Sequence, residues 1–170
     1  MVEIRTVYVT VGSTKFDALI KTVTTDEVLK ILQSNGCKNL ILQIGKGLRI
    51  NEQDIAIKYG MHVEQYDFKI ESKRMDIINA DLVIGHAGAG TCLDILTNRK
   101  PGVLVINDKL MNNHQQELAL HMEKEGYLKC CTVEELENCL QNLNVNERNL
   151  YEPGKNMSSF VEFMDDLMVN

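Results

Sequence analysis

The sequence predicts an α/β fold in which one doubly wound parallel sheet is covered by helices on both faces. Short runs of β-branched and aliphatic residues alternate with helical segments along the chain, as in parallel strands joined by helical crossovers. Glycine-rich loops follow three of these runs, at the strand ends where such sheets bind ligands. With 170 residues, the chain fits one such domain over 1–144, followed by a linker and a C-terminal amphipathic helix over 145–170.

The amino-terminal half contains four predicted strands, at 5–11, 40–44, 62–66 and 81–85. The runs LILQI and DLVIG are almost continuously apolar, as in strands covered on both faces, whereas 62–66 alternates weakly. Helices are expected at 25–34 and 71–79. Thr25 or Asp26 suits the N-cap of the first helix, and Gly36 suits its end. Residues 48–60 show no clear preference.

The carboxyl-terminal half continues the alternation. Helices are predicted at 92–97, 112–125 and 133–143, and strands at 103–106 and 127–131. A polar, turn-prone stretch then leads to a short helix that begins at Ser158 or Ser159. Its apolar residues at i, i+3, i+4 and i+7 are Phe160, Phe163, Met164 and Leu167. This stripe can pack on its own domain or dock a partner.

Composition excludes several classes of protein. The formal net charge is −6, with 18 Lys and Arg against 24 Asp and Glu, so we expect no nucleic-acid partner. Five cysteines without CxxC spacing predict neither a zinc site nor a secreted disulfide framework. No apolar run approaches the roughly 18 residues of a membrane span. A cytoplasmic chain without a direct membrane span is the expectation.

The segment GHAGAGT at 85–91 is the strongest candidate for a binding loop. Its glycines and alanines remove side-chain bulk, so backbone N–H groups and the positive end of the next helix can approach an anion such as a diphosphate. The order G-x-x-G-x-G matches neither the dinucleotide fingerprint nor the P-loop, which argues against a nicotinamide cofactor or an ATPase. A tight strand-to-helix turn without a ligand would have the same composition.

Two further loops point to the same edge. Residues Gly12, Ser13 and Thr14 follow the first strand, and the segment GKG at 45–47 follows the second. In a parallel sheet all three loops open on one rim. Together with the hydroxyl of Thr91, their convergence predicts a phosphate or nucleotide site.

Polar side chains after the strand at 103–106 form a second candidate site. The segment NNHQQ at 112–116 offers amide and imidazole groups suited to sugar hydroxyls, although a solvated helix start would also contain them. Asp94 can accept hydrogen bonds from ribose hydroxyls or can simply complement the helix dipole.

His86 and His114 are candidates for acid/base catalysis because histidine titrates near neutral pH. A structural or ligand-orienting histidine would look the same in the sequence. No pair of carboxylates and no Ser/His/Asp arrangement indicates a self-contained hydrolase.

Four segments together resemble one family. They are VTVGSTKFDALI at 9–20, LILQIGKG at 40–47, DLVIGHAGAGTCLDIL at 81–96 and VLVINDKLMNNHQQELA at 103–119. They resemble the small catalytic subunits of the eukaryotic UDP-N-acetylglucosamine transferase of dolichol-linked oligosaccharide synthesis, which are family 28 glycosyltransferases. The resemblance covers about residues 4–131 and extends to the C-terminal half of the bacterial lipid II glycosyltransferase.

The resemblance implies a single Rossmann-like unit, equivalent to the C-terminal half of a GT-B glycosyltransferase. Such a unit binds UDP-GlcNAc, while a separate membrane-anchored subunit binds the dolichol-linked acceptor. The implied reaction transfers GlcNAc to GlcNAc-diphosphodolichol with inversion, without a metal or cofactor. The partner would supply the general base and would bring the chain to the cytosolic face of the endoplasmic reticulum.

The resemblance also implies roles for individual residues. Gly12, Ser13 and Thr14 would line the diphosphate, and so would His86, Ala87, Gly88, Ala89, Gly90 and Thr91. The main chain near Lys69 and Ile70 would contact uracil. Asp94 stands where relatives usually carry a glutamate that holds the ribose. Residues Asn113, His114 and Gln115 would grip the hydroxyls of the donor sugar.

Two other classes of function remain open at this point. The chain can be a non-catalytic nucleotide-sugar-binding or regulatory module, or a small UDP-sugar enzyme that acts alone. An enzyme acting alone fits less well, because GT-B enzymes react in a cleft between two such halves and only one is encoded here.

Overall fold

The computed structural model describes residues 2–109 and 113–169. These residues form a six-stranded sheet in the order β3-β2-β1-β4-β5-β6, with all neighbouring strands parallel. The strands are β1 (Thr6–Thr10), β2 (Asn39–Gln43), β3 (His62–Tyr66), β4 (Leu82–His86), β5 (Gly102–Ile106) and β6 (Lys129–Thr132). This is the doubly wound order in which the chain reverses direction beside β1, so β1 and β4 flank the switch point.

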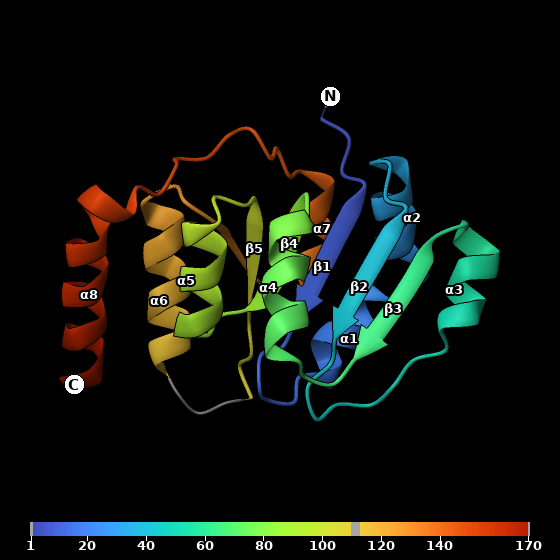
Figure 1. The fold of residues 1–170 in the computed structure, drawn as a ribbon, viewed down its shortest axis with the longest axis horizontal. Helices are drawn as coiled ribbons and strands as arrows, with labels where there is room; N and C mark the ends of the chain where they lie inside the picture. The colour runs from blue at the N-terminus through green and yellow to red at the C-terminus, as the bar shows by residue number, and fades with distance from the viewer. Residues whose placement is uncertain (1, 110–112, 170) are drawn as a thin grey trace.

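Helices cover both faces of the sheet (Figure 1). One face carries α1 (Asp17–Val23), α2 (Asp26–Ser34), α3 (Glu52–Tyr59) and α7 (Leu136–Gln141). The other face carries α4 (Ile70–Asn79), α5 (Ala89–Thr97), α6 (Asn113–Lys124) and α8 (Pro153–Val169). Successive strand residues point to opposite faces, so Val7 and Val9 join one apolar cluster and Tyr8 joins the other. The continuous apolar runs in the sequence follow from this double cover.

The ambiguous segment 48–60 forms helix α3. Asn51 caps its start by accepting a hydrogen bond from the Gln53 N–H at 3.1 Å, and Gly60 ends it with a φ of +64°. Only Ile55 and Tyr59 of this helix are buried, so its apolar periodicity is weak. The caps, rather than the periodicity, define this element.

Helix α8 begins at Pro153, several residues before the predicted start at Ser158 or Ser159. Proline suits the first position of a helix because the N–H it lacks would have no partner there. Phe160 and Leu167 are buried against the α4–α6 side of the sheet, and the rings of Phe163 and His121 stack with centroids 3.9 Å apart. The apolar stripe therefore packs on its own domain.

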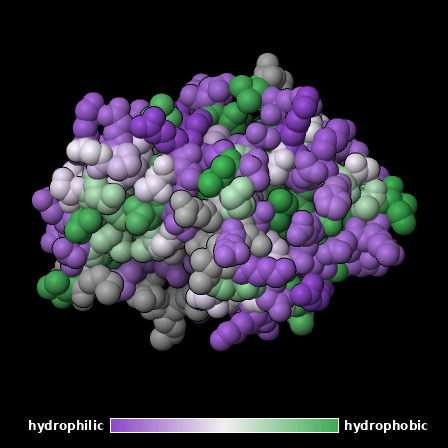
Figure 2. Space-filling view, viewed as in Figure 1, coloured by the Kyte–Doolittle hydropathy of each residue, from purple (hydrophilic) through white to green (hydrophobic). Residues whose placement is uncertain are grey.

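Two other helices differ from their predicted bounds. Helix α5 starts at Ala89 rather than at residue 92, and α7 is shorter than the predicted 133–143. On the surface shown in Figure 2, exposed apolar side chains are scattered among hydrophilic ones. Within residues 2–109 and 113–169, no helix combines the length and apolar character needed to cross a membrane.

Candidate functional site

The loops that follow β1, β2 and β4 lie at the carboxyl edge of the sheet, at the lower side of Figure 1. Strands β1 and β4 are direct neighbours, with Thr10 opposite Gly85. The loops after these two strands therefore meet at the switch point. As predicted, the parallel sheet brings the three glycine-containing loops to one rim.

His86 is the last residue of β4, and its imidazole ring lies between two glycines. A Cβ atom on Gly12 would come within 2.5 Å of His86 Cε1, and one on Gly88 would come within 2.4 Å of Nε2. Thr91 Oγ1 lies 3.3 Å from Nδ1 of the same ring. The prediction that the small residues of the loop at 85–91 leave open space for an anion is therefore wrong at Gly88, because the His86 ring fills that space.

Gly90 differs from Gly88. It is exposed in the first turn of α5, and a Cβ atom there would meet nothing within 4 Å. The first backbone hydrogen bond of the helix runs from Cys92 N–H to Gly88 O at 3.0 Å, so the helix uses none of the N–H groups between them. The positive end of α5 thus faces open space at the switch point, a geometry that favours an anion. Ala89 is half-buried beside it, and Ala87 is fully buried in the core.

The loop after β2 braces the loop after β1. A Cβ atom on Gly45, which has a φ of +57°, would come within 2.0 Å of the Thr14 carbonyl oxygen, and Lys46 N–H donates to that oxygen at 3.3 Å. The hydroxyl of Thr14 donates to Val11 O at 2.9 Å, while Ser13 is exposed. The close approach explains why glycine occupies position 45.

The predicted sugar-binding residues follow β5. His114 and Gln115 lie in the first turn of α6, and among the described residues no hydrogen-bond partner reaches the buried atoms His114 Nδ1 and Gln115 Oε1. Buried polar atoms normally have partners, so these two hydrogen-bonding groups are unsatisfied in the described structure. The side chain of Asn113 lies outside the described part of the structure.

The remaining predicted residues lie on neighbouring helices. Asp94 is half-buried in α5, and Lys69 is the exposed N-cap residue of α4, which begins at Ile70. The side chain of Ile70 also lies outside the described part. Direct contacts link Gly12, His86, Gly88 and Thr91. Asp94, His114 and Gln115 are placed by helices α5 and α6 of the same face.

Sequence reasoning missed a buried polar pair beneath the rim. Thr10 and Gln43 are opposite each other at the ends of β1 and β2, and both are fully buried. Thr10 Oγ1 donates to Gln43 Oε1 at 2.5 Å, and Gln43 Nε2 donates to the carbonyl oxygens of Gly12 at 2.7 Å and Asp67 at 2.6 Å. The available signal was a glutamine inside the apolar run LILQI, because a buried amide needs partners.

A second buried polar group lies beside this pair. The Tyr66 hydroxyl is 2.5 Å from Asp76 Oδ2 on α4 and 3.2 Å from the Tyr8 hydroxyl on β1. Burial raises the pKa of Tyr8 to about 12 and also raises the pKa of Tyr66. Both phenols stay protonated at neutral pH, so they act here as hydrogen-bonding groups.

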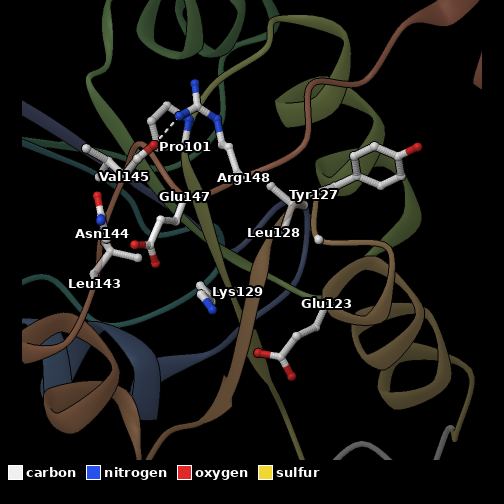
Figure 3. Close-up of a pocket in the computed structure, with 12 residues that line it drawn as sticks. Pro101, Glu123, Tyr127, Leu128, Lys129, Leu143, Asn144, Val145, Glu147 and Arg148 are labelled. Atoms are coloured by element: carbon white, nitrogen blue, oxygen red, sulfur yellow. Dashed lines mark hydrogen bonds between the residues drawn. The ribbon is translucent and has the colours of Figure 1, made fainter.

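A pocket at the opposite end of the sheet is a separate feature (Figure 3). It is lined by residues from the amino ends of β5 and β6 and from the segment before α8, including Pro101, Lys129 and Arg148. Arg148 donates to the Val145 carbonyl, as the dashed line in Figure 3 shows, and to the Arg99 carbonyl at 3.2 Å. At about 40 Å³ the pocket has room for only a few water molecules. None of the predicted site residues lines it.

Comparison with known protein families shows to which family this chain belongs. The profile of the glycosyltransferase family 28 C-terminal domain matches residues 6–168. The chain belongs to this family. The human UDP-N-acetylglucosamine transferase subunit ALG13 is 49% identical over 126 residues, which are 74% of this chain. The Cryptococcus neoformans protein of the same name is 32% identical over 194 residues, covering 96% of each chain. The chain spans only 11% of the human relative.

Solved structures agree with this fold. The NMR structure of ALG13 has a TM-score of 0.69 and 25% identity, covering 92% of this chain and 93% of that one. The crystal structure of Acinetobacter baumannii MurG has a TM-score of 0.62 and 16% identity, covering 99% of this chain and 50% of that one. The predicted Rossmann-like unit, equivalent to the C-terminal half of a GT-B glycosyltransferase, is confirmed.

Proposed function

We propose that this chain is the donor-binding, catalytic subunit of an N-acetylglucosaminyltransferase that moves GlcNAc from UDP-GlcNAc to GlcNAc-diphosphodolichol. The observation that carries the proposal is the open N-terminus of α5 at the switch point, flanked by the Gly12 loop and by Gly90. Membership of the family 28 C-terminal domains and the names of the relatives support the choice of a UDP-GlcNAc donor.

The proposed site binds the donor along the rim. The diphosphate lies at the N-terminus of α5, near the loop containing Gly12, Ser13 and Thr14. The uracil lies against the main chain near Lys69 and Ile70, and Asp94 accepts hydrogen bonds from the ribose hydroxyls. The unpartnered atoms His114 Nδ1 and Gln115 Oε1 support a sugar end beside α6, with Asn113 next to them.

The proposed chemistry is a single inverting displacement. The acceptor 4-hydroxyl oxygen attacks C1 of GlcNAc, the bond from C1 to the diphosphate oxygen breaks, and UDP leaves with the negative charge. The positive end of α5 and the loop N–H groups stabilise this developing charge without requiring a divalent ion. The hydroxyl proton passes to a general base on the partner subunit.

We assign orienting roles to the two histidines. The His86 ring is held between Gly12 and Gly88 and lies beside Thr91, so it shapes the diphosphate loop. His114 faces the proposed donor sugar. Neither role requires the histidine to exchange a proton with substrate.

The acceptor requires a second protein in this proposal. A membrane-anchored, acceptor-binding subunit completes the cleft and carries the dolichol-linked substrate. The chain itself is cytoplasmic and reaches the cytosolic face of the endoplasmic reticulum through that partner. The word subunit in the names of the relatives supports an assembly of this kind.

Reconstitution tests the proposal. The chain is assayed with UDP-GlcNAc and GlcNAc-diphosphodolichol, with and without a co-expressed membrane-anchored subunit. We expect chitobiosyl lipid only when both proteins are present. Turnover by the chain alone would show that it is a stand-alone enzyme and not half of one. Donor binding without turnover, even in the complex, would favour a non-catalytic module.

A further inference from the structure

We propose that Gln43 is a positioning residue that holds two donor-facing loops in register through a single buried amide. The inference rests on the proposed function, because it assigns the Gly12 loop to the diphosphate and the segment after β3 to the uracil. Gln43 touches neither ligand in this scheme. It acts through the main chain of Gly12 and Asp67.

The orientation of the Gln43 amide is determined by its partners. The carbonyl oxygens of Gly12 and Asp67 can only accept, so the NH₂ group must face them and both of its protons are used. The opposite Oε1 atom accepts from the Thr10 hydroxyl. Flipping the amide would set its Oε1 atom against the two carbonyl oxygens of Gly12 and Asp67, so only the arrangement seen here is stable.

Thr10 completes the hold on the first loop. Its Oγ1 atom accepts from the Gly12 N–H at 3.2 Å, while Gln43 binds the Gly12 carbonyl. Both polar backbone groups of Gly12 are therefore held by Thr10 and Gln43. Because the His86 ring packs against Gly12, a displacement of this residue would also disturb the contact made by His86.

The second loop is fixed at Asp67. Its carbonyl oxygen accepts from Gln43 Nε2 at 2.6 Å and from the Gly45 N–H at 3.0 Å. Asp67 lies two residues before Lys69, the residue at the N-cap position of helix α4. Gln43 is thus the one side chain here that bonds both loops directly, and it adds to the backbone bonds made by Gly45 and Lys46 in setting the distance between the proposed uracil and diphosphate contacts. A shift of about 1 Å between binding groups is enough to weaken binding markedly.

Titration of the isotope-labelled 170-residue chain with UDP and uridine, followed by the NMR shifts of backbone amides, tests this role. Gln43→Met keeps the volume of the side chain and removes its hydrogen bonds. We expect at least about tenfold weaker binding of UDP and a weaker response to uridine, together with altered amide shifts of Gly12 and Gly45 without ligand.

Gln65→Met is the matched control. Gln65 also bonds main chain twice, since its Nε2 donates to Ile50 O at 2.8 Å and its Oε1 accepts from Ile50 N–H at 3.0 Å. It holds the approach to α3 rather than the Gly12 loop. We expect Gln65→Met to lower the free energy of unfolding and to leave UDP affinity within about twofold of the wild type. The reason is that Gln65 does not bond the Gly12 loop.

Thr10→Val provides a second, milder variant. It removes the hydroxyl that holds Gly12 N–H and leaves both donors of Gln43 in place. We therefore expect weaker binding of UDP but unchanged binding of uridine. This variant decides the question if Gln43→Met fails to fold.

The outcomes separate the two proposals. If the wild-type chain does not bind UDP, the proposed function fails. If the wild type binds and folded Gln43→Met binds UDP equally well, Gln43 is structural only and the inference fails. The inference is also overturned if Gln65→Met weakens UDP binding as much as Gln43→Met, or if Thr10→Val leaves UDP binding unchanged.

Discussion

The imidazole ring of His86 lies directly against the backbone of Gly12, so that a methyl group on residue 12 would come within 2.5 Å of the ring carbon Cε1. A Cβ atom on Gly88 would come within 2.4 Å of the neighbouring ring atom, Nε2. The space that the sequence suggested for a ligand at Gly88 is thus filled by a side chain of the protein itself. The open part of the rim lies further along, at Gly90.

Gly90→Val tests whether this open space is the ligand site. A Cβ atom there meets no neighbouring element within 4 Å and the position is exposed, so we expect the free energy of unfolding to change by less than about 0.5 kcal/mol. The side chain would occupy the proposed diphosphate position and abolish UDP binding, measured by calorimetric titration. Wild-type UDP affinity in this variant would exclude the assignment.

Gly88→Val should behave differently. Its Cβ atom would lie 2.4 Å from His86 Nε2, so the ring must move. We expect both UDP binding and stability to fall, whereas Gly90→Val affects UDP binding alone. Denaturant unfolding of both variants distinguishes them.

His114→Ala and Gln115→Ala test the sugar end of the site. Each removes a buried polar atom that has no described partner, so little stability depends on its hydrogen bonds. We expect about tenfold weaker binding of UDP-GlcNAc with unchanged binding of UDP. Gln116→Ala, at the exposed neighbouring position, serves as the control. Equal losses for both ligands would place these side chains away from the sugar.

The raised pKa of Tyr8 predicts that the free energy of unfolding falls at alkaline pH. Burial raises its pKa from 10.0 to about 12, so above pH 10 the unfolded state releases this proton while the folded state keeps it. The stabilisation that results from the raised pKa of Tyr8 is therefore complete below pH 10 and is lost as the pH rises towards 12. Tyr8→Phe should show a shallower fall in the free energy of unfolding over this interval. An unchanged slope would contradict the raised pKa.

Helix α8 is predicted to be part of the fold. Phe160 is buried beside Tyr151, with ring centroids 6.5 Å apart, so Phe160→Ala should cost about 3 kcal/mol of unfolding free energy. Val161, the next residue, is exposed, and Val161→Ala should cost less than about 0.5 kcal/mol. Thermal unfolding compares the two. Similar small effects would mean that α8 does not rest on the core in solution.

The sheet could be predicted because its strands are buried on both faces. Runs such as LILQI and DLVIG carry the signal locally, and the loops that follow them mark the rim. Helix α3 was not predicted, since it buries only Ile55 and Tyr59. The start of α8 was missed because Pro153 and Gly154 also suit a turn.

The site was predicted only as far as local sequence allows. The glycine loops and the polar residues of α6 are visible as segments. Gln43 is not, because its partners Gly12 and Asp67 are 31 and 24 residues away. The same holds for the His86 ring, whose place between Gly12 and Gly88 depends on strands β1 and β4 being neighbours.

Gln43 donates its hydrogen bonds to main-chain carbonyl oxygens, which every residue has. Its hold on the rim therefore does not depend on which side chains stand at positions such as 13, 68 or 69, all of which are exposed. The position of the loops and the identity of the side chains that they carry can therefore change independently. We expect exchange of these exposed residues to change what the proposed site binds while the loops keep their spacing.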